Sequence, residues 1–426
     1  MKAPLPSLGL VVVVLAAAAC GPRLPGTLKP RSAATPIATP MSCPQAVYGK
    51  PCFTPGPTPT PSSVPNIGVS DVAFSTAEDG WAVGSSCVDS TQTCTLLADK
   101  TSNAGASWSR PISLGQFPQE GSPGGSPATP LSIRFVGANM WVSGPGIYES
   151  HDSGLTWKRV FNSPVEALEP AGTTAWAIAG CTIADPSVSC VLFTSRIGSD
   201  VWSRSAVQPP IGIAAYSAQG WVSVLLERAP HGVAFVTGGS PQPGSQPWLA
   251  ITRNDGATWR KSRLPCTFGI AGLRSPDGTT VWLLCGGGGG AGSGPKAVYV
   301  SFDGGTSWEE RANDLSNPPV GSISGAGYAT GLAVTNGGIA LIGSSRAGII
   351  RSVDGGRSWN DVGSNATCLL EGNGVDELWL LANGLGWALE ENDDGGPQCP
   401  LLIRTTNAGL TWNSERAPLG WTALQG

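Results

Sequence analysis

Histidine, charge and long apolar runs are all scarce in this sequence. Its 426 residues include only 2 His, and 13% of them are charged. So few imidazoles, and no C-x-x-C pair near them, argue against a zinc site. After residue 65 the chain carries 20 basic and 29 acidic residues, a net charge of −9. That balance offers no basic footprint for nucleic acid, so we expect no nucleic-acid partner.

The one notable apolar run lies at the N-terminus, from Leu8 to Ala19, and has 12 residues. A membrane-spanning helix needs about 20 residues. The run follows Lys2 and ends in Ala17-Ala18-Ala19, which is typical of a signal peptide covering residues 1–19. The stretch up to Cys20 resembles the bacterial lipobox, which implies a diacylated Cys20 as the mature N-terminus. We therefore expect an extracytoplasmic protein anchored to the bacterial membrane through Cys20, with plain secretion as the alternative.

Residues 20–66 predict a tether. Positions 21 to 65 hold 12 Pro among 45 residues, together with many Thr and Ser, and the first 65 residues contain no Asp or Glu. Such a composition cannot bury a core and favours extended polyproline II conformations. The domain that follows is expected to span residues 67–426.

Cysteine, unlike histidine, is present in quantity. The chain has 11 Cys, and setting Cys20 aside for lipid leaves an even number. An even set in an exported protein predicts disulfides, although sequence alone leaves their connectivity open. The candidates are Cys43, Cys52, Cys87, Cys94, Cys181, Cys190, Cys266, Cys285, Cys368 and Cys399.

An eight-residue sequence recurs along the rest of the chain, and we call it the octapeptide. It has Ser or Thr first, Asp or Asn third, Gly fifth and Trp last, as in Ser150-His-Asp-Ser-Gly-Leu-Thr-Trp157. Six copies begin at residues 101, 150, 252, 301, 352 and 405, and a degenerate copy runs from Ser195 to Trp202. Each is preceded by an apolar strand such as Gly80-Trp-Ala-Val-Gly84. Seven units of about 50 residues with four short strands each predict an all-β, seven-bladed β-propeller of four-stranded antiparallel blades.

The octapeptide resembles the Asp box, S/T-x-D-x-G-x-T/S-W, of bacterial-neuraminidase (BNR) repeats. These repeats occur in sialidases, sortilin-type receptors, xyloglucanases and photosystem II assembly-factor propellers. The Gly80-Trp-Ala-Val-Gly84 element with its octapeptide is most similar to the last group. The resemblance covers residues 67–426 and implies the propeller fold; it implies no particular ligand.

The octapeptide residues are expected to be structural. Gly at position five suits a positive φ, the third residue accepts backbone N–H groups of the turn, and the Trp packs between blades. Half of the six good copies carry Asn at position three, so the turn needs an acceptor and no negative charge, which argues against calcium and general-acid roles. The residues given these roles are Asn103, Gly105, Trp108, Asp152, Gly154, Trp157, Asn254, Gly256, Trp259, Asp303, Gly305, Trp308, Asp354, Gly356, Trp359, Asn407, Gly409 and Trp412.

No motif in the sequence names a reaction. A sialidase needs three converging arginines, and the inner strands supply only Arg134 and, less clearly, Arg274. Glycosidase carboxylates are available at Glu166, Glu169, Asp376 and Glu377, but their separation cannot be known from sequence, and solvated strand ends are the simpler interpretation. No G-x-S-x-G occurs.

Two further segments have structural explanations. The glycine run 286–290 lacks a following Gly-Lys-Ser/Thr, so it predicts a hairpin loop rather than a phosphate loop. The acidic run Glu390–Asp394 lacks the alternating ligands of a calcium loop and predicts an exposed hairpin.

Two functional hypotheses follow from the sequence. The first is a non-catalytic, monomeric scaffold without cofactor or metal that binds an envelope protein or glycan. The second is a carbohydrate-active exo-enzyme, sialidase-like or another glycoside hydrolase. Buried carboxylates or arginines at the central channel would favour the enzyme, and neutral or apolar loops would favour the scaffold.

Overall fold

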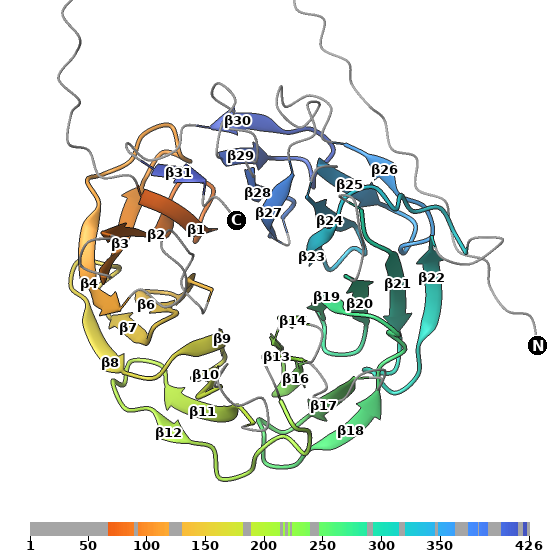
Figure 1. Ribbon diagram of the computed structural model, residues 1–426, viewed down its shortest axis with the longest axis horizontal. Helices are drawn as coiled ribbons and strands as arrows, with labels where there is room; N and C mark the ends of the chain where they lie inside the picture. The colour runs from red at the N-terminus through yellow and green to blue at the C-terminus, as the bar shows by residue number, and fades with distance from the viewer. Residues whose placement is uncertain are drawn as a thin grey trace, which may run out of the picture. The chain divides into compact units, whose positions relative to one another are not determined.

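Each octapeptide lies in the turn between the third and fourth strands of a four-stranded antiparallel sheet. Seven such sheets follow one another around a ring, with the first strand of each innermost and the fourth outermost (Figure 1). The predicted seven-bladed β-propeller is therefore confirmed. Most fourth strands begin one residue after the octapeptide Trp, and the first blade's begins at Ile112.

The computed structural model describes residues 67–88, 93–118, 130–181, 189–213, 216–217, 220–221, 224–238, 247–287, 293–314, 320–345, 348–362, 374–381, 383–390, 402–415 and 421–423. All of them belong to one compact unit, Ser63–Gly426. The predicted signal peptide, Cys20 and the tether lie outside the described residues, as do Cys43, Cys52, Cys368 and Cys399.

The strands of the seven blades are numbered in chain order. Blades 1 to 3 contain β1 (Ile67–Phe74), β2 (Gly80–Val88), β3 (Thr93–Thr101), β4 (Ile112–Pro118); β5 (Ser132–Val136), β6 (Asn139–Ser143), β7 (Ile147–Ser150), β8 (Lys158–Phe161); β9 (Val165–Ala171), β10 (Thr174–Ala179), β11 (Val191–Arg196) and β12 (Ser203–Arg204). Blades 4 and 5 contain β15 (Leu225–Ala229), β16 (Val233–Thr237), β17 (Trp248–Thr252), β18 (Arg260–Arg263); β19 (Ile270–Arg274), β20 (Val281–Gly286), β21 (Lys296–Ser301) and β22 (Glu309–Asn313). Blades 6 and 7 contain β23 (Ala329–Val334), β24 (Ala340–Ser344), β25 (Gly348–Ser352), β26 (Asn360–Asp361); β27 (Val375–Leu380), β28 (Gly386–Glu390), β29 (Leu402–Thr405) and β30 (Asn413–Glu415).

Two elements lie outside this pattern. A short hairpin, β13 (Tyr216–Ser217) and β14 (Gly220–Trp221), separates blades 3 and 4 in the chain. The C-terminal strand β31 (Trp421–Ala423) pairs in parallel with β1, where Ile67 is opposite Trp421. Each blade is thus built from its own contiguous stretch of chain, and the C-terminal strand adds a fifth strand to blade 1, where the two ends of the ring meet (Figure 1).

The core lies between blades, because each sheet packs both faces against its neighbours. For this reason the second strands are apolar on both faces, and every residue of β16 is buried. Each octapeptide Trp joins a cluster with residues of the preceding blade: Trp157 meets Trp81 edge-on at 6.0 Å between ring centroids, and Trp259 lies 5.9 Å from Trp176.

Hydrogen bonds within the octapeptide explain why its composition is restricted. In blade 2, Asp152 Oδ1 accepts the Thr156 N–H at 2.9 Å, and Ser150 Oγ accepts the Gly154 N–H at 2.8 Å. The corresponding amide oxygen of Asn254 accepts the Thr258 N–H at 2.9 Å. Gly154 has φ 85°, and a Cβ there would lie 2.2 Å from Trp81, so the turn and the packing of the neighbouring blade both require glycine.

Three disulfides occur among the described residues: Cys87–Cys94, Cys181–Cys190 and Cys266–Cys285. The first two join the ends of hairpin loops, and the third links β20 to the segment before β19. Disulfides are consistent with an oxidising, extracytoplasmic compartment.

Loss of the Cys266–Cys285 bond is expected to destabilise the propeller by about 3 kcal/mol, because the bond closes a 19-residue separation. The double variant Cys266→Ala/Cys285→Ala should unfold at a lower denaturant concentration than wild type. The matched variant Cys87→Ala/Cys94→Ala opens a shorter separation of 7 residues and should lose less stability. Equal denaturation midpoints for wild type and the Cys266/Cys285 variant would contradict this account.

Candidate functional site

The candidate site is a cavity of about 330 Å³ lined by all seven inner strands or the residues next to them. Leucines and alanines of β9, β15 and β19 supply much of its wall. Its charged lining is uneven, with four carboxylates against two guanidinium groups: Asp71, Glu166, Glu169, Glu377, Arg134 and Arg274. The cavity therefore carries an excess of acidic groups.

β-bulges direct several of these side chains toward the cavity. In β9 the register passes from Val165 to Ala167 opposite consecutive residues of β10, so Glu166 is the extra, unpaired residue of a bulge. The same irregularity precedes Asp71 in β1 and Glu377 in β27. A bulge bends the strand and re-aims the side chains beside it, and here these side chains reach the cavity.

Arg134 of β5 is the centre of an ion-pair network. Its Nη1 lies 2.8 Å from Asp71 Oδ2, and its Nε lies 3.0 Å from Glu169 Oε1. The guanidinium stacks 4.3 Å from the ring of Trp379, whose Nε1 donates to Asp71 Oδ1 at 3.2 Å. Burial lowers the pKa of Arg134, but Glu169 and Asp71 outweigh that effect and hold the pKa above its usual value. The network joins strands of blades 1, 2, 3 and 7, so much of this arginine's charge is already balanced inside the protein.

Arg274 of β19 forms a looser pair. Its Nη1 lies 3.6 Å from Oε2 of Glu227 in β15, whose Oε1 accepts the Ser275 N–H at 2.9 Å. Burial raises the pKa of Glu227 to about 7 even though Arg274 opposes the shift. Arg274 is a third exposed and remains accessible from the cavity.

Glu166 is the carboxyl group best placed to meet a ligand. It lines the cavity, it is half-buried, and no cation or hydrogen-bond donor contacts its carboxylate among the described residues. Burial raises the pKa of Glu166 to about 7. Near neutral pH this group is poised between its neutral and charged forms.

The structure thus brings together five residues that the sequence analysis considered for catalysis, namely Glu166, Glu169, Glu377, Arg134 and Arg274. The Asp376 side chain lies outside the described part of the chain. Among the described residues only two arginines line the cavity, so the three-arginine cluster of a sialidase is not formed there. The sequence analysis did not identify Asp71, Glu227 or Trp379 as site residues. Asp71 could have been found, because a carboxylate inside an otherwise apolar inner strand is unusual.

Other polar candidates are held in structural contacts. Hydrogen bonds from Thr156 lower the pKa of Asp152 to about 2, so this octapeptide carboxylate is ionised at neutral pH. Lys296, which follows the glycine run, is fully buried and donates to the carbonyl oxygens of Ala326 and Gly327 at 2.6 and 2.7 Å. Phosphate binding by Lys296 is therefore not supported.

The expected exposure of the acidic run is wrong for its first residue. Glu390 is 1% exposed at the end of β28, and neither carboxylate oxygen has a hydrogen-bond partner among the described residues. Burial raises its pKa to about 7. Residues 391–394 lie outside the described part of the chain.

No helix in the described ranges is both long and apolar enough to span a bilayer. No protein-family model matches the sequence, and neither does any curated protein.

Solved structures with the same fold do exist. A structure described as YCF48 bound to D1 peptide aligns with a TM-score of 0.50 and 14% identity over 80% of this chain and 94% of that chain. YCF48 from Cyanidioschyzon merolae aligns with a TM-score of 0.51 and 19% identity over 77% and 95% of the two chains. A GH74 xyloglucanase from Xanthomonas campestris aligns with a TM-score of 0.48 and 13% identity over 82% of this chain, which spans 61% of that one. At these identities the likeness is one of fold, a seven-bladed propeller similar to those of the YCF48 structures.

Proposed function

We propose that this protein is an extracytoplasmic, membrane-anchored and non-catalytic binding module that holds an envelope protein at the mouth of its acidic cavity. The observation that carries the proposal is the charge balance of the cavity, where four carboxylates face two arginines. Arg134 is already paired with Asp71 and Glu169, so the uncompensated group is acidic. A lysine or arginine side chain on a loop or terminus of the partner fits this chemistry.

The location follows from separate observations. The three disulfides agree with an oxidising compartment. The lipobox-like sequence at Cys20 and the proline-rich tether supply the proposed anchor and spacer. One of the similar propellers is described with a bound peptide, so the fold is able to hold such a ligand, although that peptide says nothing about this chain's partner.

The test is capture of the full-length anchored protein from cross-linked native membranes, followed by mass spectrometry and repetition with matched variants. Glu166→Gln removes the free cavity carboxyl, and Glu78→Gln changes an exposed glutamate in the β1–β2 turn. One stoichiometric partner that Glu166→Gln loses and Glu78→Gln retains supports the proposal. A partner held equally by both variants would place the binding surface elsewhere and contradict the cavity as the site.

Binding should strengthen with pH. Because the pKa of Glu166 is about 7, this carboxyl is mostly neutral near pH 6 and mostly ionised near pH 8. A charge pair at a partly exposed site is worth about 1 kcal/mol, so the affinity for a basic partner is expected to rise about fivefold across that range. Titration of the purified partner by calorimetry should show this rise for wild type and a flatter profile for Glu166→Gln; identical profiles would exclude Glu166 as the recognising group.

A carbohydrate-active enzyme is the second candidate, and one observation favours it. A glutamic acid whose pKa burial raises to about 7, placed beside further carboxyl groups, is an arrangement that glycosidases use for acid and base roles. Hydrolysis of a glycoside by wild type, abolished in Glu166→Gln, would replace the binding proposal with this one.

A further inference from the structure

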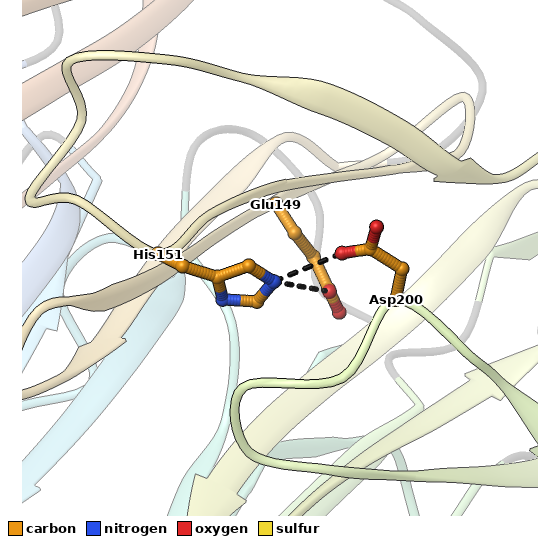
Figure 2. A group of neighbouring side chains, drawn as sticks. All are labelled: Glu149, His151 and Asp200. Atoms are coloured by element: carbon orange, nitrogen blue, oxygen red, sulfur yellow. Dashed lines mark hydrogen bonds and ion pairs between the residues drawn. The ribbon is translucent and has the colours of Figure 1, made fainter.

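A second polar cluster lies at the outer part of the ring, between blades 2 and 3, away from the cavity lining. Glu149 lies in β7, His151 is the second residue of the blade 2 octapeptide, and Asp200 belongs to the degenerate octapeptide of blade 3. Figure 2 shows the His151 ring pointing toward both carboxylates. His151 Nε2 lies 2.9 Å from Asp200 Oδ1 and 3.8 Å from Glu149 Oε2, and one ligand atom from each residue lies within 4.8 Å of the others.

We propose that Glu149, His151 and Asp200 form a Zn²⁺ site that links blades 2 and 3, with a water molecule as the fourth ligand. One imidazole and two carboxylates are ligands that zinc takes, and three protein ligands plus water complete a tetrahedron. Zinc bonds of about 2.0–2.2 Å in that geometry separate ligand atoms by about 3.3 Å. The distances from His151 Nε2 to the two carboxylate oxygens, 2.9 Å to Asp200 and 3.8 Å to Glu149, lie on either side of that value.

The orientation of His151 supports metal binding. Its Nδ1 lies 2.8 Å from Asn139 Oδ1, an acceptor, so Nδ1 carries the proton and donates it to the amide oxygen. With the proton on Nδ1, Nε2 can give its lone pair to a zinc ion; without metal, a second proton on Nε2 can instead bond Asp200 Oδ1, 2.9 Å away. Holding the ring through the second nitrogen is what neighbours of metal-bound histidines do.

The two carboxylates are held in the same manner, each by the oxygen that does not face the site. Glu149 Oε1 accepts the indole N–H groups of Trp141 and Trp202 at 2.7 and 2.8 Å. Its Oε2 is buried, has no hydrogen-bond partner among the described residues and faces His151. Asp200 Oδ2 is held by Lys158 Nζ at 2.5 Å. Each proposed ligand therefore has one atom fixed by a neighbour and one atom directed at the site.

The sequence of the degenerate octapeptide is explained by this arrangement. It has Ile197 where the other copies have Asp or Asn, and its carboxylate stands three positions later, at Asp200. Only the adjacent copy, in blade 2, has histidine at position two. Blade 3 thus lacks the usual internal acceptor of its turn and carries instead a carboxylate that reaches the neighbouring blade. His151 and Asp200 are both part-exposed, which leaves an entry path for the ion. The proposal departs from the sequence-based expectation of no metal site, and it does not depend on the proposed function.

The test starts with the purified full chain, which is treated with chelator, dialysed and titrated with ZnCl₂ by calorimetry. We expect one equivalent of zinc per chain, a melting temperature that rises with zinc concentration, and much weaker binding of Ca²⁺ and Mg²⁺, which prefer all-oxygen ligands. Absence of saturable zinc binding would overturn the proposal.

Matched variants locate the ion. Asn139→Ala, which removes only a positioning contact, should weaken zinc binding about 10- to 100-fold, and His151→Asn and Asp200→Asn, which remove ligands, should each weaken it more. The controls are His231→Asn, at the other histidine of the chain, and Asp303→Asn, in another octapeptide, and both should bind zinc like wild type. Co²⁺ substitution separates this site from cysteine ligands, because thiolates add intense near-ultraviolet charge-transfer absorption. A thiolate band, or an affinity unchanged in His151→Asn and Asp200→Asn, would refute the assignment.

Discussion

Replacement of Trp412 by alanine is expected to lower the free energy of unfolding by about 3–5 kcal/mol, the range for truncating a large buried aromatic side chain. Trp412 is only 2% exposed and packs with Leu341 and Ile349 of the preceding blade. In the same turn, a Cβ on Gly409 would lie 2.5 Å from Leu341, so the interface has little room to collapse around the cavity that alanine leaves.

Leu410→Ala is the matched control for this prediction. Leu410 lies in the same octapeptide but is 55% exposed, so its truncation should change stability by less than about 0.5 kcal/mol. Urea and thermal unfolding of the two variants measure the difference directly. Similar midpoints for Trp412→Ala and Leu410→Ala would show that the octapeptide Trp does not stabilise the interface between blades.

The second large loss of stability is expected when Arg134 is replaced by alanine. Removing one partner of a buried ion pair leaves the other charge without compensation, which costs about 3–5 kcal/mol. Arg134→Ala would leave Asp71, whose side chain is 3% exposed, and Glu169 without the cation that both contact. Arg274→Ala should cost less, because Arg274 is more exposed and lies 3.6 Å from its partner.

The double variant Arg134→Met/Asp71→Asn identifies the cause of the loss of stability expected in Arg134→Ala. If the loss of stability in Arg134→Ala comes from an unpaired buried charge, the double variant should recover a large part of it, because the buried Asp71 is then neutral and only Glu169, which is 26% exposed, is left without its cation. If Arg134 is present to bind a ligand, Arg134→Ala should unfold like wild type while partner capture falls. Denaturation and capture measured on the same variants separate these two roles.

The charged residues that line the central cavity bear on the choice between a binding module and an enzyme. Buried carboxylates and arginines at the channel were the feature expected of an enzyme, and they are present. However, Arg134 is balanced by Asp71 and Glu169, contacts that join separate blades and stabilise the ring. The Glu166 carboxylate meets no cation or hydrogen-bond donor among the described residues, and burial raises its pKa to about 7, so both the binding proposal and its enzymatic alternative are tested at this residue.

The local parts of this protein follow from its sequence because their interactions are local. The hydrogen bonds of the octapeptide join residues two to four positions apart, as between Asp152 and Thr156, so eight residues suffice to specify the turn. The repeated order of apolar strand, octapeptide and next strand then determines four-stranded blades, and seven units determine the ring. The even number of cysteines likewise predicted disulfides, but their pairing required the structure, in which Cys87 and Cys94 lie opposite each other across one turn.

The tertiary structure decided the chemistry of the two sites. Asp71 and Trp379 are separated by 308 residues, and they meet only because the ring brings blade 7 against blade 1. The bulges beside Asp71, Glu166 and Glu377 leave no sequence signature here, and a shift of one residue in a strand turns a side chain to the opposite face. Glu149 and Asp200 likewise come from different blades and meet at His151 only through the packing of one sheet on the next. Sequence alone therefore determined the blade and its turns, through contacts within a few residues, whereas the register and the order of blades around the ring decided which charges lie together.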